Sequence, residues 1–293
     1  MLHRLDITNY RSIARAHVEL RPFTLLVGAN GSGKSNLLRL LLDLSRARSR
    51  TELTKHFNLP TSTTQISIHG PSGLGVHLDG QYKGPKHPEL TSVRRFLIDP
   101  ARIGDAEVLV ARPEVKPDGE GAVQVLDSLK TGDREDLFQR LEATFRDFVP
   151  EIEKLSFVPG QTSKRLQVRE DHIGTPVLVS DLSEGARLIL TILAIAFQER
   201  KPSIICLEGL DRGLHPALFA KLVLLCRSLA EGPDAPQIIA TTHNPYLVDE
   251  LVLDEAGVVL VEKSEGKTSF TPLSRAKGPG SKWFRPPAPD GTA

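Results

Sequence analysis

The sequence has little cysteine and no long apolar run. Cys206 and Cys226 both lie in apolar segments, with neither a metal-ligand spacing nor a framework for disulfides. We therefore predict that both pack in the core and that the protein works in the reducing cytoplasm. No stretch reaches the roughly eighteen consecutive apolar residues that a membrane-spanning helix needs, and residues 1–12 lack the apolar segment of a signal peptide. These absences predict a soluble protein with no membrane partner.

The chain also has almost no excess of either charge. Its 37 basic residues offset 36 acidic ones, which leaves a formal net charge of +1. This balance excludes a global field that would attract nucleic acid, so any contact with DNA has to be local. The candidates for such a contact are arginines in two regions: Arg46, Arg48, Arg50, Arg94, Arg95 and Arg102. The alternative is that these side chains stabilise helix ends or remain solvated.

What the chain does have is enough length and apolar content for a large core, with 293 residues of which 40% are hydrophobic. Hydrophobic periodicity predicts strands within residues 5–27 and a helix through the leucines of 37–44. Residues 51–116 are rich in glycine, proline and histidine. They predict irregular strands and loops, with short alternating pieces at 65–69 and 75–78.

The second half of the chain alternates apolar runs with helical patterns. Strands that are apolar throughout and alternate with helices are typical of a parallel sheet covered on both faces. The predicted fold class is therefore α/β. The expected elements are helices over 133–148, 183–199 and 216–229, and strands over 152–158, 164–170, 204–207, 237–241, 258–262 and 268–271.

The strongest motif is GANGSGKS, Gly28 to Ser35, which follows a buried strand and precedes a helix. It matches the pattern G-x-x-x-x-G-K-[ST], in which glycines turn backbone amides toward phosphate oxygens at the positive end of a helix. Lys34 is then expected to bridge the β- and γ-phosphates and Ser35 to bind Mg²⁺. We predict ATP and Mg²⁺ as cofactors. The expected nucleotide-binding residues here are Gly28, Ala29, Asn30, Gly31, Ser32, Gly33, Lys34, Ser35 and Asn36.

Two other strands end in polar residues that suit catalysis. The strand 204–207 leads to Glu208 and then Asp211. A carboxylate at the carboxyl end of a buried strand beside a phosphate loop is placed to hold Mg²⁺, so Glu208 is the candidate; the alternative is a solvated strand-end charge. The strand 237–241 likewise delivers His243 to the edge where open parallel sheets bind ligands, and the alternative is a structural histidine.

The segment DLSEGAR, residues 181–187, opens the predicted helix 183–199. Ser183 is a good helix N-cap. Ser183 and Gly185, at a helix N-terminus, also form an anion site. Capping alone and anion binding are both open interpretations of this motif.

In this order GANGSGKS, LSEGAR, the acidic strand end with GLHP, and TTHNP resemble the Walker A, signature, Walker B with D-loop, and His-switch motifs of ABC-type ATPases. The opening LDITNYRSI and the joined GLHP and TTHNP resemble the AAA-type ATPases related to RecF, SMC and the ATPase half of OLD nucleases. The resemblance covers about residues 1–45 and 150–272. It implies a P-loop NTPase of the ABC/SMC-head type, with a mostly parallel sheet flanked by helices, an antiparallel β subdomain and a less regular middle insertion.

The resemblance also implies a division of the chain into an ATPase head over 1–275 and a tail over 276–293. The head would carry Walker A within 1–50, a variable middle at 51–150, and the remaining motifs within 151–275. The tail is dense in proline, glycine and charge, which indicates disorder or a partner-binding extension.

In such families two heads sandwich two ATP molecules. The resemblance therefore implies an ATP-dependent homodimer in which Ser183 and Gly185 contact the γ-phosphate in trans. His243 would sense or polarise the γ-phosphate, and residues 211–215 would form the D-loop region that crosses the interface.

One position departs from the pattern of these families. Relatives carry a second acidic residue that orients the attacking water, where this chain has Gly209. Because phosphoryl transfer depends mostly on positioning and electrostatics, this absence predicts slow hydrolysis. Asp211 is a candidate substitute, but its reach does not follow from sequence.

The predicted function is an ATP-binding switch with weak or partner-stimulated ATPase activity. Its context would be DNA maintenance or anti-phage defence with a separate protein effector, because no nuclease domain is identifiable. The alternative is a largely non-catalytic, ATP-dependent scaffold for a protein partner. The motor subunit of a membrane transporter is disfavoured because the signature lacks the LSGGQ form.

Overall fold

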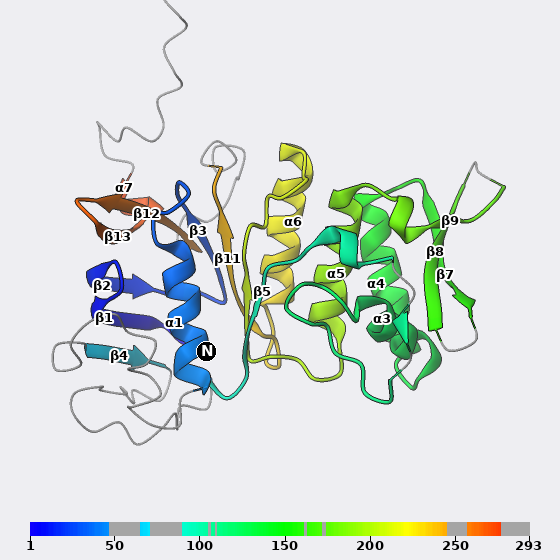
Figure 1. Cartoon of the computed structure of the whole chain (residues 1–293), viewed down its shortest axis with the longest axis horizontal. Coiled ribbons are helices and arrows are strands. Elements are labelled where there is room, and N and C mark those ends of the chain that lie inside the picture. The colour runs from blue at the N-terminus through cyan, green and yellow to red at the C-terminus, as the bar shows by residue number, and fades with distance from the viewer. Residues whose placement is uncertain are drawn as a thin grey trace, which may run out of the picture. The chain divides into compact units, whose positions relative to one another are not determined.

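The computed structural model describes residues 1–46, 65–70, 90–104, 107–108, 110–160, 163–171, 174–244 and 257–276. The chain folds into two compact units that interleave along the sequence, and Figure 1 labels their elements. Unit 1 comprises Met1–Val93, Gly209–Asp211 and Gln237–Ala293, and unit 2 comprises Arg94–Glu208 and Arg212–Pro236.

Unit 1 contains an antiparallel sheet of three strands in the order β2-β1-β4. Leu5 and Ile7 on β1 are buried and alternate with more exposed neighbours, so one face of this sheet packs on the core. The strands are β1 (Arg4–Tyr10), β2 (Ile13–Glu19) and β4 (Gln65–His69).

The second sheet of unit 1 is built around β3, whose five residues are all buried. Strands β11 and β12 flank β3 and run parallel to it, while β13 pairs with β12 as an antiparallel hairpin. Helix α1 follows β3 and buries its leucine face, as the sequence predicts. The bounds are β3 (Phe23–Val27), α1 (Lys34–Arg46), β11 (Gln237–Thr242), β12 (Val258–Ser264), β13 (Lys267–Pro272) and α7 (Leu273–Ala276).

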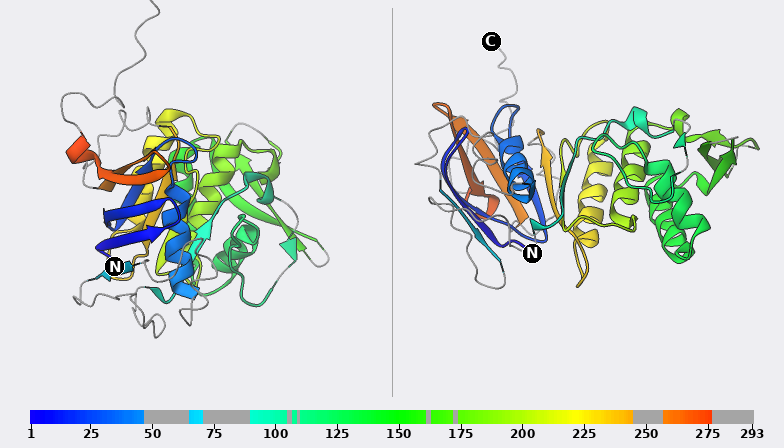
Figure 2. Two further views of the ribbon diagram at one scale, coloured as in Figure 1. Left: turned by 60° about the vertical axis from the view of Figure 1, so that its left-hand side comes forward. Right: turned by 60° about the horizontal axis from the view of Figure 1, so that its bottom comes forward.

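Unit 2 carries most of the described helices. Helix α5 is apolar almost throughout and is buried at nearly every position, which makes it the central element of this unit. Figure 2 shows the green hairpin β7–β8 at the edge of unit 2, beyond the helices. The elements are β5 (Val93–Phe96), η2 (Pro100–Arg102), β6 (Glu107–Val108), α3 (Ala122–Thr131), α4 (Glu135–Phe148), β7 (Ile152–Pro159), β8 (Ser163–Glu170), β9 (Val177–Leu178), η3 (Val179–Asp181), α5 (Glu184–Phe197), β10 (Ile204–Leu207) and α6 (Pro216–Leu229).

The α/β fold class and the elements expected in the second half are confirmed, with ends that differ by at most a few residues. Helix α3 was not predicted. Its N-cap is Gly121, which makes no side-chain capping bond, so the sequence lacks a start signal there. The expected piece at 75–78, Arg48, Arg50 and the tail beyond residue 276 lie outside the described residues.

Both cysteines are buried, as predicted, in β10 and α6. Burial raises the pKa of Cys206 and of Cys226 to about 12. Among the described helices, none is both long and apolar enough to cross a membrane.

Candidate functional site

The loop of residues 28–33 connects the buried strand β3 to the first turn of α1. The Gly28 N–H donates to the Thr242 carbonyl of β11 at 3.3 Å, so the loop starts as a continuation of the parallel ladder. A Cβ on Gly28 would lie 2.1 Å from the Val261 carbonyl oxygen of β12. Only glycine allows this close approach between the loop and the neighbouring strand.

The ammonium of Lys34 lies inside this loop. Lys34 Nζ donates to the carbonyl oxygens of Gly28 at 2.6 Å and of Ala29 at 2.9 Å, and only 8% of the residue is exposed. The loop therefore holds a positive charge at the N-terminus of α1, where the helix dipole is also positive. This combination attracts a multiply charged anion such as triphosphate.

A network of hydroxyl groups braces the loop from the rest of unit 1. Thr268 on β13 is buried, and its hydroxyl donates to the Ser32 carbonyl at 2.8 Å and lies 2.7 Å from the Ser12 hydroxyl. Asn36 Nδ2 on α1 donates to the same Ser12 oxygen at 2.8 Å. A Cβ on Gly33 would lie 2.3 Å from Thr268 Oγ1. Sequence reasoning missed Ser12 and Thr268, because their link to the loop depends on pairing between distant segments.

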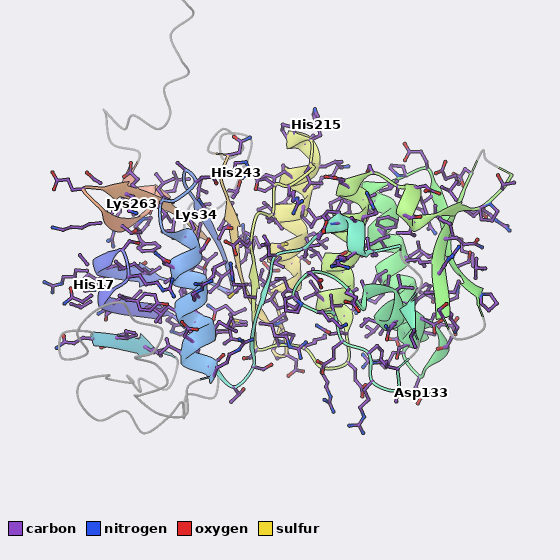
Figure 3. The ribbon with its side chains drawn as sticks, viewed as in Figure 1. His17, Lys34, Asp133, His215, His243 and Lys263 are labelled. Carbon is purple, nitrogen blue, oxygen red and sulfur yellow. The ribbon has the colours of Figure 1, made fainter. Side chains whose placement is uncertain are left out.

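His243 and Asp211 lie at the same sheet edge as this loop. Thr242 is in register with Val27, so His243 leaves β11 beside the start of the loop, and Figure 3 shows Lys34 and His243 at the same end of α1 and β11. Asp211 arrives there because the Gly209 and Leu210 amides donate to Thr241. The two side chains meet, with Asp211 Oδ2 3.0 Å from His243 Nδ1.

Gly209 adopts a φ of +70°, and a Cβ at this position would meet nothing within 4 Å. Open space is thus present at the position where the family resemblance implies a water-orienting carboxylate, but the backbone there is left-handed. A residue with a side chain is strained in this conformation, by roughly 1–2 kcal/mol.

In unit 2, Glu208 forms an ion pair that the sequence did not predict. Both Nε and Nη2 of Arg95 donate to Glu208 Oε2, the first at 2.8 Å. The Glu208 amide donates to the Phe96 carbonyl at 2.9 Å, which places Arg95 on the neighbouring strand β5 beside this carboxylate. Part of the Glu208 charge is therefore neutralised within unit 2.

Ion pairs with carboxylates also occupy the other unit 2 arginines that the sequence offers as candidates for DNA contact. Arg94 pairs with Glu114, and Arg102 lies 3.6 Å from an oxygen of Asp118. Together with Arg95 these side chains are engaged with carboxylates of unit 2. Arg46 is exposed at the end of α1.

The signature segment opens helix α5 as predicted. Ser183 is the N-cap, and its hydroxyl oxygen accepts a hydrogen bond from the Ala186 amide at 3.2 Å. Gly185 is buried, and a Cβ there would lie 2.8 Å from Leu214 Cδ2, so packing alone already requires a small residue at this position. Ser183 itself is exposed.

The structure thus brings the loop residues Gly28 to Asn36, Asp211 and His243 together in unit 1, and it assigns Glu208, Ser183 and Gly185 to unit 2. Ser35 is exposed at the start of α1. Its hydroxyl and the Glu208 carboxylate are oxygen donors of the kind that Mg²⁺ prefers, so the donor chemistry fits this ion.

A phosphate-binding loop between a buried parallel strand and a helix, with a histidine at the end of the adjacent strand, defines a P-loop ATPase. The fold agrees with this class. The crystal structure of an SMC head bound to the C-terminal winged-helix domain of ScpA matches with a TM-score of 0.58 and 13% identity, over 92% of this chain and 96% of that chain. The Smc head domain with an extended coiled coil, bound to the C-terminal domain of ScpA from Pyrococcus furiosus, matches with a TM-score of 0.54 and 12% identity, over 92% and 95% of the two chains.

Sequence families narrow the assignment. The family described as "AAA domain, putative AbiEii toxin, Type IV TA system" matches residues 80–249, and the family described as "AAA ATPase domain" matches residues 1–84. The chain belongs to the first of these families, an AAA-type ATPase with the fold of an SMC head. No curated protein sequence matches at a significant level.

Proposed function

We propose that the protein binds Mg²⁺-ATP on residues 28–36 and uses it as a dimerisation switch. The observation that carries the proposal is the Lys34 ammonium, held inside the loop at the N-terminus of α1. The positive φ angles of Gly31 and Gly33 let backbone amides turn inward around phosphate oxygens. Lys34 would exchange its carbonyl partners for the β- and γ-phosphate oxygens.

Ser35 and Glu208 are the residues that would hold Mg²⁺. The ion, when bound, neutralises negative charge that develops on the phosphates. For Glu208 to act as a ligand, its hydrogen bonds with Arg95 would have to be exchanged or shared. This competition is one reason to expect weak hydrolysis.

The switch would operate through contacts made in trans. Ser183 is exposed at the N-terminus of α5, so its hydroxyl and the first amides of the helix can meet a phosphate on a second copy of the chain. Arg212, Gly213 and His215 are exposed in the segment that we expect at the interface. Asp211, the first residue of this segment, is buried.

The absence of a carboxylate at Gly209 is a second reason to expect slow turnover. A protein partner would then supply stimulation or read out the nucleotide state. The SMC heads that share the fold are bound to domains of ScpA, which supports a protein partner here. The family description, which names the AbiEii toxin and a Type IV TA system, favours a role in defence with a separate effector over DNA maintenance.

The second candidate function is a scaffold that binds ATP without turning it over. Gly209 and the Arg95–Glu208 pair favour it, since together they remove one catalytic carboxylate and engage the other. Steady-state ATPase assays with and without DNA distinguish the two functions. A switch hydrolyses ATP slowly and measurably, and a scaffold gives the same rate as a variant that cannot bind.

The proposal is tested by calorimetric ATP binding and by the molar mass of the protein with Mg²⁺ and a slowly hydrolysed ATP analogue. Lys34→Ala should weaken ATP binding by at least about 100-fold and abolish dimerisation, because the loop loses its only ammonium. Lys263→Ala is the matched control, since this lysine is exposed on β12 (Figure 3). Ser183→Arg should keep ATP binding but block the dimer. Unchanged ATP affinity in Lys34→Ala would refute the assignment of the loop.

A further inference from the structure

The pair formed by Asp211 and His243 has a polarity that follows from its geometry. His243 Nδ1 lies 3.0 Å from Asp211 Oδ2 as an ion pair, and because a carboxylate only accepts hydrogen bonds, Nδ1 is the donor in any hydrogen bond between them. In a neutral imidazole the other nitrogen, Nε2, then presents a lone pair. The pair therefore favours a histidine that accepts a proton over one that donates to a phosphate.

Burial decides which member of the pair can touch a ligand. The Asp211 side chain is 3% exposed, whereas the His243 side chain is 56% exposed. Asp211 cannot orient a water molecule directly in this arrangement, although it is the first acidic residue after Gly209 in the sequence. Any effect of Asp211 on the reaction has to pass through the His243 ring.

The remaining oxygen of Asp211 supports a functional origin for the pair. Asp211 Oδ1 is buried and has no hydrogen-bond partner among the residues that the structure describes. Leaving a buried acceptor unsatisfied is destabilising, and such groups in native proteins call for an explanation beyond stability. A pair kept for packing would be replaced by apolar residues at little loss.

We propose that His243, positioned by Asp211, accepts the proton of the attacking water, the role that a carboxylate at position 209 would otherwise fill. The inference rests on ATP binding at residues 28–36. Water oxygen forms a bond to the γ-phosphorus while the bond from that phosphorus to the bridging oxygen breaks, and ADP leaves with the electron pair. His243 Nε2 takes the water proton and later releases it to solvent or to the phosphate product.

The location of the ring agrees with this role. His243 follows Thr242, whose carbonyl accepts the Gly28 amide, so the histidine leaves β11 beside the first residue of the phosphate loop. The Leu210 amide donates to the Thr241 carbonyl at 2.8 Å and fixes the segment that carries Asp211 on the same strand. Asp211 is accordingly a positioning residue, and His243 is the catalytic one.

His243→Gln separates the two possible roles of the ring. A glutamine amide can still donate to a phosphate but cannot accept a proton from water. We expect single-turnover hydrolysis of labelled ATP, with protein in excess, to fall about 100-fold or more, while the ATP dissociation constant changes less than about threefold. His3→Gln, on another exposed histidine of unit 1, is the control and should leave both unchanged. A His243→Gln rate within about threefold of the parent would overturn the proposal.

Asp211→Asn tests the positioning role with a spectroscopic readout. An asparagine amide can donate to Nδ1 and move the proton to Nε2, which nitrogen-15 spectra of the histidine ring report directly. The rate loss should accompany this change of tautomer, and a changed tautomer with a parental rate would contradict the inference. If the parent binds ATP but hydrolyses it no faster than Lys34→Ala, the proton-acceptor role is wrong while nucleotide binding stands. If the parent binds no ATP, the proposed function fails first.

Discussion

The two inner glycines of the phosphate loop allow a matched test of how unit 1 shapes its binding site. Gly31 and Gly33 both have positive φ, at +76° and +111°. A Cβ on Gly31 meets nothing within 4 Å, whereas a Cβ on Gly33 lies 2.3 Å from Oγ1 and 2.7 Å from Cγ2 of Thr268. Gly31→Ala thus introduces backbone strain alone, and Gly33→Ala adds a collision with a buried side chain.

The difference can be estimated from the contacts. An alanine at the φ of Gly31 costs about 1 kcal/mol, and the φ of Gly33 lies outside the left-handed helical region, where strain rises to about 2–3 kcal/mol. Thr268 cannot move away without losing its hydrogen bond to the Ser32 carbonyl, worth about 1 kcal/mol. Since about 1.4 kcal/mol is a factor of ten, Gly31→Ala should weaken ATP binding about fivefold and Gly33→Ala by at least about 100-fold.

Calorimetric ATP titrations with both variants check this ordering, with circular dichroism to establish that each is folded. Adding Thr268→Ala to Gly33→Ala removes Oγ1 and Cγ2 and should restore part of the affinity, which appears as a favourable coupling in the double-mutant cycle. If Gly33→Ala and Gly31→Ala bind ATP equally well, the brace between β13 and the loop has no role in binding.

Two further predictions concern unit 2 and the core. The buried Asp127 accepts from Lys164 Nζ at 2.7 and 2.8 Å, so Lys164→Met should lower the free energy of unfolding by about 3 kcal/mol in denaturant melts. Lys116→Met, which breaks an exposed pair with Glu120, should change it by less than about 0.5 kcal/mol, and equal effects would contradict the burial argument. Because burial raises the pKa of Cys206 and Cys226 from 9.0 to about 12, a thiol reagent at about pH 8 should label them only after unfolding. The stability that these neutral, buried thiols contribute is complete below pH 9.0 and is lost as the pH rises toward about 12. Labelling of the folded protein, or a free energy of unfolding that stays flat above about pH 9, would contradict the burial of the two thiols.

The sequence predicted those parts of the fold whose signals are local. Helix α6 begins at Pro216, as expected, because proline suits the first helical position and His215 caps it. Helix α5 begins after Ser183, whose hydroxyl oxygen makes the capping bond that its residue type favours. Helix α3 begins after Gly121 without a side-chain cap, so no comparable signal exists.

The candidate site divides in the same way. The loop residues follow from a motif with fixed spacing, and their positions could be predicted without the fold. The pairings of Arg95 with Glu208, of Asp211 with His243 and of Thr268 with Ser32 join segments that are distant in sequence. They depend on which strands become neighbours and in what register, which one sequence does not specify. From the sequence, Arg95 is therefore a candidate for DNA contact or a solvated charge, whereas in the structure its partner is the carboxylate expected to bind Mg²⁺.

The division of the chain places the phosphate loop in one unit and two other residues expected to act in hydrolysis and dimerisation in the other. The phosphate loop and the hydroxyl brace belong to unit 1, so the proposed phosphate contacts are assembled within one compact unit, which also holds the pair of Asp211 and His243 proposed to act in hydrolysis. Glu208 and Ser183 belong to unit 2, where Arg95 already engages the carboxylate. Changes in unit 2 should therefore alter hydrolysis and dimerisation while ATP affinity stays near that of the parent. A switch needs ATP affinity that is independent of the hydrolysis rate, because it has to keep its nucleotide bound until a partner stimulates hydrolysis.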